Sequence, residues 1–317
     1  MKTLINKIPV PIAGLMLALA ATGNLVASYG KLYKSIFGGL ATLILILLTI
    51  KIFTNTKAVL ESLKNPVVAS VSPTYSMGIM ILATYLKPIQ PTLAYGTWIA
   101  GLLIHVGLIL YVTKAFILNF NIKKIFPSYF VVYVGIVVGS VTAPAFNAFA
   151  IGQSLFWFGF VSYMILLPIV LYRVFKIKSI PEPALPTIAI FAAPASLCLA
   201  GYMSSFQEKN LNIVWLLTGL SLIMLFAVLL SMPKLLKLKF YPSYAAFTFP
   251  CVISAIAIKK TTGFLAATDH GIAVFPYIVK FEEFIAVAIV LYVLIRFSNF
   301  LFITKPQSSE ANISKSS

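Results

Sequence analysis

Polar positions in this chain are confined to short stretches between long apolar blocks. Ten blocks are each about as long as the 20 residues that a helix needs to cross a bilayer. They fall at about 8–29, 35–53, 66–86, 91–115, 127–149, 152–173, 184–205, 211–232, 240–258 and 274–302. The pattern predicts an all-α membrane protein with ten transmembrane helices.

The odd-numbered spans form a repeat, because each opens on a proline. These prolines are Pro9, Pro66, Pro127, Pro186 and Pro242, at intervals of 57, 61, 59 and 56 residues. The segment Pro-Ser-Tyr at 127–129 recurs at 242–244. A fixed period of this size indicates repeated architecture. We therefore expect five helical hairpins arranged around a central axis.

The two kinds of span differ in chemistry. Even spans are smooth and aliphatic, as in 43–48, whereas odd spans carry Pro, Gly, Ser and Thr at membrane depth. Prolines bend a membrane helix and are tolerated where hydroxyls, water or neighbouring helices satisfy the freed backbone groups. We expect an inner ring of kinked odd helices within an outer ring of even ones. Residues expected to line the pore are Pro73, Ser76, Gly135, Gly139, Pro194 and Pro250. Close helix packing is the alternative explanation for small residues.

Composition supports a membrane setting. The 317 residues are 60% hydrophobic and 10% charged, against roughly 25% charged in soluble domains. We expect one transmembrane domain over 1–303 and a disordered cytoplasmic tail over 304–317. The first block has some features of a signal peptide, but its length and its place in the repeat favour a retained first span.

The net charge of +17 is unevenly placed between the two sets of loops. Seven of the 24 Lys and Arg residues fall on one face, leaving 17 for the face that carries both termini. The seven are Lys31, Lys34, Lys87, Lys209, Lys259, Lys260 and Lys280. This bias follows the positive-inside rule. It predicts a multi-pass protein of the cell membrane with cytoplasmic termini, bound by lipid and not by nucleic acid.

Ionisable groups are scarce inside the spans. The acids are Glu61, Glu182, Glu208, Asp269, Glu282, Glu283 and Glu310, and none lies near the middle of a span. We expect Glu282 and Glu283 in a solvated outer turn, with Glu283 pairing with Lys280 at i,i+3. The scarcity disfavours proton or sodium antiporters and cation channels with acidic rings. A passive pathway for anions stays open.

His105 is the one titratable histidine within a span. It is expected to bond a neighbouring carbonyl or hydroxyl, with pH sensing or proton coupling as the alternative. Lys259 and Lys260 either concentrate anions at a pore mouth or anchor the helix at the interface. Cys198 and Cys251 are expected to be inert packing residues. No metal site, cofactor or catalytic motif is expected, and an ATP-driven pump would need another subunit.

Several motifs together resemble a known family. They are Asn65-Pro66-Val67 opening the third span, Pro127-Ser128-Tyr129 opening the fifth, Ala193-Pro194-Ala195 in the seventh, and Ala246-Phe247-Thr248-Phe249-Pro250 in the ninth. In order, spacing and topology they resemble the TehA-like tellurite-resistance and dicarboxylate transporter (TDT) family, which includes the plant slow-type anion channels. The resemblance covers about 8–302.

The resemblance implies a homotrimer whose protomers each hold a pore lined by the five odd helices. It implies that a phenylalanine of the ninth helix, here Phe249, plugs the pore, with packing against an adjacent helix as the alternative. It also implies small inorganic or organic anions as the transported species. The chain departs from the family in lacking mid-span prolines in the first and fifth helices, where Val132 stands at the position of one.

Three functions follow from these observations. The first is a gated anion channel that closes by dewetting at Phe249. The second is a secondary exporter of a dicarboxylate, sulfite or tellurite-type oxyanion, with His105 available for proton linkage. The third, a membrane enzyme or assembly scaffold, is disfavoured by the absence of catalytic groups.

Overall fold

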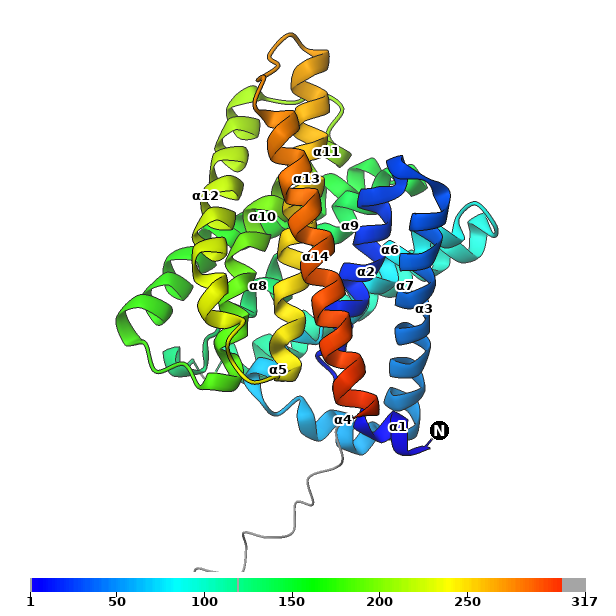
Figure 1. Cartoon of the computed structure of the whole chain (residues 1–317), viewed down its shortest axis with the longest axis vertical. Coiled ribbons are helices and arrows are strands. Elements are labelled where there is room, and N and C mark those ends of the chain that lie inside the picture. Colours follow the sequence, from blue (N-terminus) through cyan, green and yellow to red (C-terminus); the bar gives the residue numbers. More distant parts are fainter. Residues whose placement is uncertain (1, 119, 304–317) are drawn as a thin grey trace, which may run out of the picture.

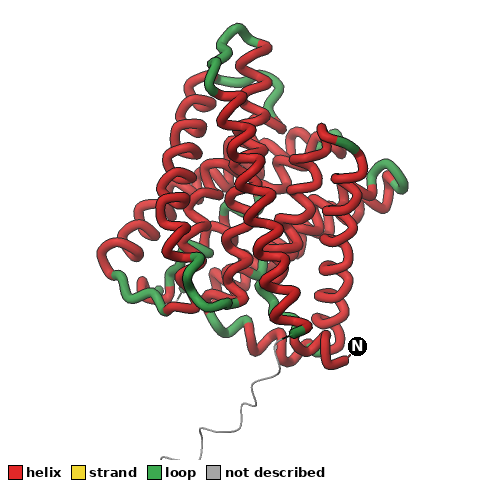
Figure 2. Tube along the Cα trace, viewed as in Figure 1, coloured by secondary structure: helices red, strands yellow, loops and turns green. Residues whose placement is uncertain are grey.

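The computed structural model describes residues 2–118 and 120–303, and these residues contain helices and no strand (Figure 2). The predicted tail at 304–317 lies outside the described residues. Eight helical segments are long and apolar enough to cross a membrane. They correspond to eight of the ten predicted spans. The fifth and tenth predicted spans are not among them.

Four long outer helices match the even spans that precede the last one. They are α3 (Lys31–Thr54), α7 (Pro91–Val112), α10 (Phe149–Tyr172) and α12 (Leu211–Leu235). Two of them end in a π-helical turn, η2 (Thr113–Ile117) after α7 and η5 (Arg173–Ile177) after α10. Their exposed side chains include Leu103, Leu110, Phe226 and Leu230. An apolar surface of this kind requires lipid as its solvent.

Four of the five inner spans are each built from two helical pieces. The first is α2 (Ile12–Leu25) with η1 (Val26–Tyr29), and the third is α5 (Pro66–Val71) with α6 (Thr74–Leu86). The seventh is η6 (Glu182–Ala192) with α11 (Ala193–Ser205), and the ninth is η7 (Pro242–Phe247) with α13 (Thr248–Ala267). In the third, seventh and ninth spans the proline-rich opening thus folds as a 3₁₀ turn or short helix before the main helix begins, whereas in the first span the 3₁₀ turn follows the main helix.

The fifth predicted span is broken most strongly. It comprises α8 (Tyr129–Tyr133), α9 (Val137–Thr142) and the 3₁₀ turn η4 (Ala143–Phe146). The three residues between α8 and α9 interrupt the helix although none of them is a proline. The segment is therefore too fragmented to count as a long apolar helix, and only the shorter stretch Val137–Phe146 does.

Burial separates the two kinds of span. The four long inner segments are 61–89% buried, whereas α3, α7, α10 and α12 with their end turns are 22–33% buried. Lipid-exposed and buried spans therefore alternate along the chain, as the chemistry of odd and even spans predicts.

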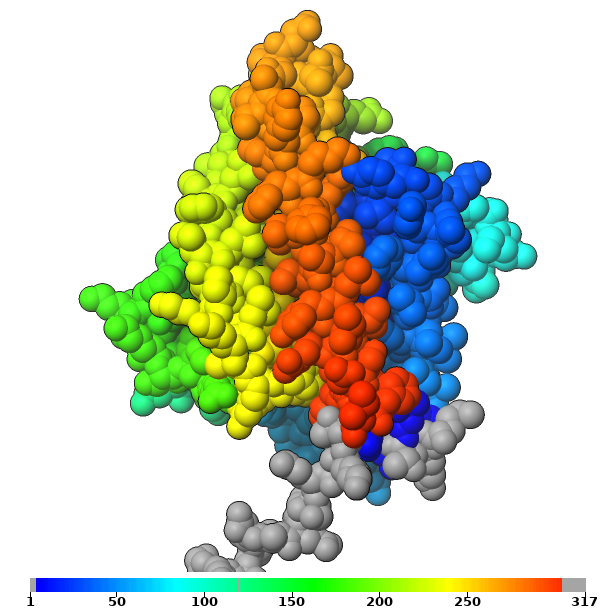
Figure 3. Space-filling view, viewed as in Figure 1, coloured from blue at the N-terminus to red at the C-terminus, as the bar shows by residue number. Residues whose placement is uncertain are grey.

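The tenth predicted span forms α14 (Phe275–Phe302), the longest helix at 28 residues. It lies across one face of the molecule, between α12 and the N-terminal helices (Figures 1 and 3). It packs on α13, and it also contacts α2 and η7. The short helices α4 (Thr56–Ser62) and η3 (Ile122–Lys124) occupy connections between the long ones, and α1 (Lys2–Lys7) precedes the first inner span.

Hydroxyl side chains donate hydrogen bonds to backbone carbonyls close to the breaks in the inner spans. Ser72 Oγ donates to the Ala69 carbonyl at 2.8 Å, and Ser196 Oγ donates to the Ala192 carbonyl at 2.7 Å. Thr248 Oγ1 donates to the Ala245 carbonyl at 2.7 Å, at the start of α13. An unsatisfied polar group at membrane depth costs on the order of several kcal/mol. These hydrogen bonds keep the serine and threonine hydroxyls near the breaks satisfied.

Candidate functional site

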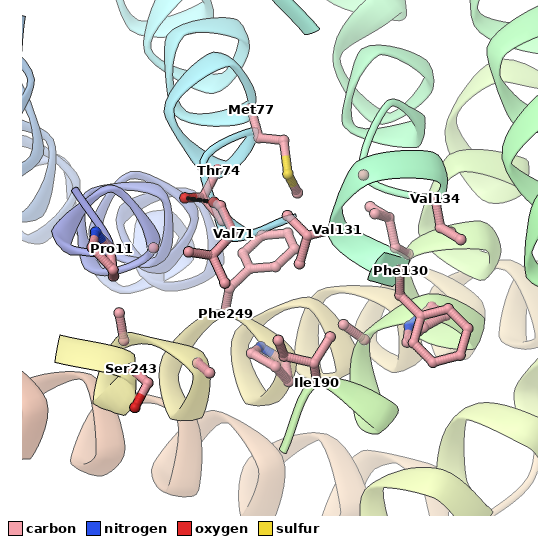
Figure 4. A pocket seen from close by; sticks show the side chains of 18 residues that line it. Pro11, Val71, Thr74, Met77, Phe130, Val131, Val134, Ile190, Ser243 and Phe249 are labelled. Carbon is pink, nitrogen blue, oxygen red and sulfur yellow. Dashed lines mark hydrogen bonds between the residues drawn. The ribbon is translucent and has the colours of Figure 1, made fainter. Parts of the chain in front are cut away.

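All five inner spans contribute side chains to one central cavity. It is lined by 18 residues, ten of them labelled in Figure 4. Pro11 and Gly14 come from the first span, Thr74 from the third, and Ile190 and Pro194 from the seventh. The space open to the centre of a water molecule is only about 40 Å³. The cavity is therefore nearly filled by its own lining.

Phe249 occupies a particular place in this lining. It extends from α13 toward Val71 and Val131 (Figure 4), and it is 6% exposed. A second cavity of about 270 Å³ lies beyond it, lined by residues that include Asn24, Thr84 and Lys260. Among the described residues, Phe249 alone lines both cavities. Phe249 therefore lies where the two cavities approach each other.

A third cavity opens at the opposite end of the central one. It has a volume of about 550 Å³ and is lined by the openings of the inner spans, including Pro9, Pro66 and Pro242. Pro11 and Ser243 line both this cavity and the central one. Three cavities therefore follow one another along the axis of the inner spans, and the narrowest lies in the middle.

The central lining is apolar and without charge. Its two hydroxyls are already engaged, because Thr74 Oγ1 donates to the Val71 carbonyl at 2.7 Å and Ser243 Oγ donates to the Pro183 carbonyl at 2.5 Å. A narrow apolar constriction that offers few hydrogen bonds to water favours the dry state. The arrangement can act as a hydrophobic gate.

The residues predicted to line a pore fall into two groups. Gly135, Pro194 and Pro250 line the central cavity together with Phe249. Pro73, Ser76 and Gly139 do not line it. Ser76 Oγ is bonded to the Pro73 carbonyl at 2.8 Å and to His105 Nδ1 at 2.9 Å. A Cβ on Gly139 would instead meet Leu102 and Leu155 of the outer helices.

Gly135 lies at the break in the fifth span for a steric reason. A Cβ at this position would overlap the Val131 carbonyl oxygen and would press on Met77 Sδ and His105 Cε1. The amides of Val134 and Gly135 both donate to the Phe130 carbonyl. The backbone therefore folds back tightly at this point, and only glycine fits.

His105 supports the same break from the outer ring. Its Nε2 lies 3.1 Å from the Val132 carbonyl, and its Nδ1 is bonded to Ser76. Since a carbonyl can only accept, Nε2 carries the proton in this bond. The prediction that His105 bonds a carbonyl or hydroxyl is confirmed. The ring ties α7 to the third and fifth spans and is fully buried.

Several cavity residues were not singled out by the sequence, among them Val71, Met77, Val134 and Ile190. They are ordinary apolar side chains in an apolar protein, so their residue types carry no signal. The prolines near them in sequence identify which segments line the cavity. The rotation of each segment about its own axis decides which side chains face inward.

The prediction of a solvated turn for Glu282 and Glu283 is wrong. These side chains are buried, at 2% and 5% exposed. Glu283 accepts from Lys259 Nζ at 2.7 Å and from Tyr29 OH at 2.5 Å, in addition to the predicted pairing with Lys280 at 3.6 Å. The partners come from three segments, so the burial could not follow from the i,i+3 spacing. Both carboxyl oxygens of Glu282 are without a hydrogen bond among the described residues.

Within the described part of the chain, no group of three or more His, Cys, Asp or Glu residues is placed to hold a metal ion. Cys198 and Cys251 are free and buried, and the latter follows Pro250 behind the central cavity. This agrees with the packing role expected for the two thiols.

Two comparisons with known proteins complete the description. The family described as voltage-dependent anion channel, SLAC1, matches residues 9–298, which include all five inner spans. No protein with a curated description matches the chain.

Proposed function

The chain belongs to the voltage-dependent anion channel family, and we propose that it passes small anions along its own axis through the three cavities, with Phe249 as the gate. Members of this family are channels or transporters rather than enzymes. The substrates proposed are small inorganic or organic anions, and no cofactor is needed.

The observation that carries the proposal is the position of Phe249. It is the one described residue that lines both the central and the outer cavity. Removing a plug at this point joins two spaces that are otherwise separated.

The chemistry of the lining favours passive conduction. No acid or base lines the central cavity, so there is no fixed charge to bind an anion strongly or to carry a proton with it. An anion would be stabilised by weak interactions and by vestibule charge, and selectivity among anions would follow their hydration. This is the behaviour of a channel with low selectivity.

The alternative is a proton-linked exporter of a dicarboxylate, sulfite or tellurite-type oxyanion. It would need a titratable group on the pathway, and His105 lies behind the lining with both ring nitrogens bonded. Flux into liposomes distinguishes the two functions. A channel gives flux that follows the anion gradient with or without a pH gradient, whereas an exporter gives saturable flux that a pH gradient drives.

We also propose the full topology of ten spans forming one transmembrane domain over 1–303, with both termini in the cytoplasm. Two observations support it besides the charge bias. Arg173, counted on the cytoplasmic face, donates to the carbonyls of Lys123 and Lys178 from the same face. Lys259 and Lys280, counted on the outer face, meet at Glu283.

Cysteine labelling tests this topology. In a chain with Lys87→Cys or Ser308→Cys, a membrane-impermeant thiol reagent should label the first from outside intact cells and the second only after permeabilisation. The buried Cys198 and Cys251 provide a low background. Labelling of both positions from the same side would require an even number of spans between them and would exclude the odd number that the proposed topology places there.

We propose a homotrimer with one pore in each protomer, because family members assemble in this way and the outer helices present broad apolar faces. Such faces suit helix packing as well as lipid. The mass of the purified protein, measured by light scattering with the detergent contribution subtracted, distinguishes one, two and three copies.

A further inference from the structure

The outer end of the pathway contains two adjoining hollows. One is the outer cavity beyond Phe249, of about 270 Å³, and the other is a groove of about 330 Å³ at the surface. Asn24, Ile256 and Lys260 line both of them. An ion passing from the surface toward Phe249 therefore passes these three residues.

The two lysines at this end of α13 have different surroundings. Lys259 Nζ is bonded to Glu283 Oε1 at 2.7 Å, to Ser28 Oγ at 2.9 Å and to the Leu25 carbonyl at 3.1 Å. Its charge is compensated and its donors are occupied. The sequence alone does not distinguish the roles of Lys259 and Lys260. In the structure, Lys259 belongs to a cluster that joins α2, α13 and α14.

Lys260 makes no hydrogen bond or ion pair with any described residue. No acid lines either hollow. A further cation acts on it, since the Lys209 ammonium repels that of Lys260. Lys209 is itself held by the Phe206 carbonyl at 2.8 Å. The outer vestibule therefore has an uncompensated positive charge whose three N–H donors are unused.

We propose that Lys260, with the side-chain amide of Asn24, forms a binding site for small inorganic anions at the outer end of the pathway. The ligand class follows from the chemistry: an ammonium and an amide donate to chloride, nitrate or sulfate, and the hollow is open enough to keep part of the ion's hydration shell. The site rests on the proposed function in that its anion is the conducted species. By binding anions, the site raises their concentration in the outer cavity next to Phe249.

A cysteine placed at Gly263 as a thiol reporter tests the binding site independently of any measurement of conduction. This residue lines the groove one turn after Lys260, and a Cβ there meets nothing within 4 Å. In Gly263→Cys protein, the rates of modification by an anionic and a cationic methanethiosulfonate are compared. Removing a unit charge a few ångströms away should lower the anionic-to-cationic rate ratio by about tenfold. We expect this drop with Lys260→Gln.

Two controls isolate the site. Lys87→Gln removes a charge of the same face from a residue that lines neither hollow, and it should leave the ratio within about twofold at ordinary ionic strength. Sulfate or nitrate, added against gluconate at equal ionic strength, should slow modification by the anionic reagent in Gly263→Cys protein and not in its Lys260→Gln derivative.

The outcomes separate this inference from the proposed function. An unchanged rate ratio with Lys260→Gln, or equal protection by sulfate with and without Lys260, overturns the site, whatever the currents show. If Lys260→Gln lowers the anionic-to-cationic rate ratio as expected but no variant conducts anions, the binding site is supported and the proposed conduction is rejected.

Discussion

Phe249→Ala is expected to raise anion current through the protein by roughly tenfold or more, since lowering a barrier by about 1.4 kcal/mol already has that effect on a rate. Phe249 is the one described residue that lines both the central cavity and the outer one. Removing it connects the cavities and opens a wider, more readily hydrated path. The measurement is current across a planar bilayer with equal amounts of purified wild-type and variant protein.

Phe247→Ala is the matched control. Phe247 lies two residues earlier, is fully buried and packs edge-to-face on Tyr244 with 4.9 Å between ring centroids. It lines none of the three cavities. This truncation should cost about 3–5 kcal/mol of stability, as other core phenylalanines do, and should not increase current. If Phe249→Ala behaves in the same way, Phe249 is a packing residue and not a gate.

Gly135→Ala is expected to reduce both stability and conduction. The added methyl group would overlap the Val131 carbonyl oxygen, which belongs to the backbone and cannot rotate away. Overpacking of this kind costs roughly 1–3 kcal/mol. Relief requires the break in the fifth span to shift, and this moves Val131 and Val134 in the central cavity. Thermal unfolding in detergent and bilayer current measure the two effects.

Gly107→Ala provides the comparison for that experiment. Gly107 lies on α7 two residues after His105, and a Cβ there has nothing within 4 Å. We expect unfolding temperature and current close to those of the wild type. Equal behaviour of the two alanine variants would show that the tight fold at Gly135 is not required.

The positions of the spans were predictable from the sequence because the bilayer imposes a length on apolar segments. The predicted span at 91–115 corresponds to α7 and η2, which cover Pro91–Ile117, and the predicted span at 274–302 corresponds to α14 at Phe275–Phe302. The difference in burial between odd and even spans could also be predicted from their residue types. A proline at membrane depth is tolerated where neighbouring helices or hydroxyl groups satisfy the freed backbone groups.

The break at Gly135 illustrates what the sequence does not contain. No proline marks it, and its cause is a set of long-range contacts: the His105 ring from α7, Met77 from α6 and the Val131 carbonyl meet around one glycine. A glycine in an apolar segment is equally consistent with close helix packing, which is what Gly139 provides. Only the folded arrangement distinguishes the two.

Charge compensation at the outer end was hidden for the same reason. Lys259 and Glu283 are 24 residues apart and lie on different helices, so no local spacing rule pairs them. Lys259 and Glu283 are paired with each other, whereas the residues next to them in sequence are not. Neither Lys260 nor Glu282 has a hydrogen-bonding partner among the described residues. Neighbours in sequence on one helix thus have different surroundings.

The reversal potential of the Phe249→Ala current tests the central claim most directly. With a tenfold gradient of potassium chloride across a planar bilayer, a pathway for anions should reverse near the equilibrium potential of chloride, about 59 mV at 25 °C for a singly charged ion. Replacing chloride by nitrate or sulfate on one side should then shift the reversal potential. A reversal potential near that of potassium, or no current from correctly folded protein, would contradict anion conduction along this axis.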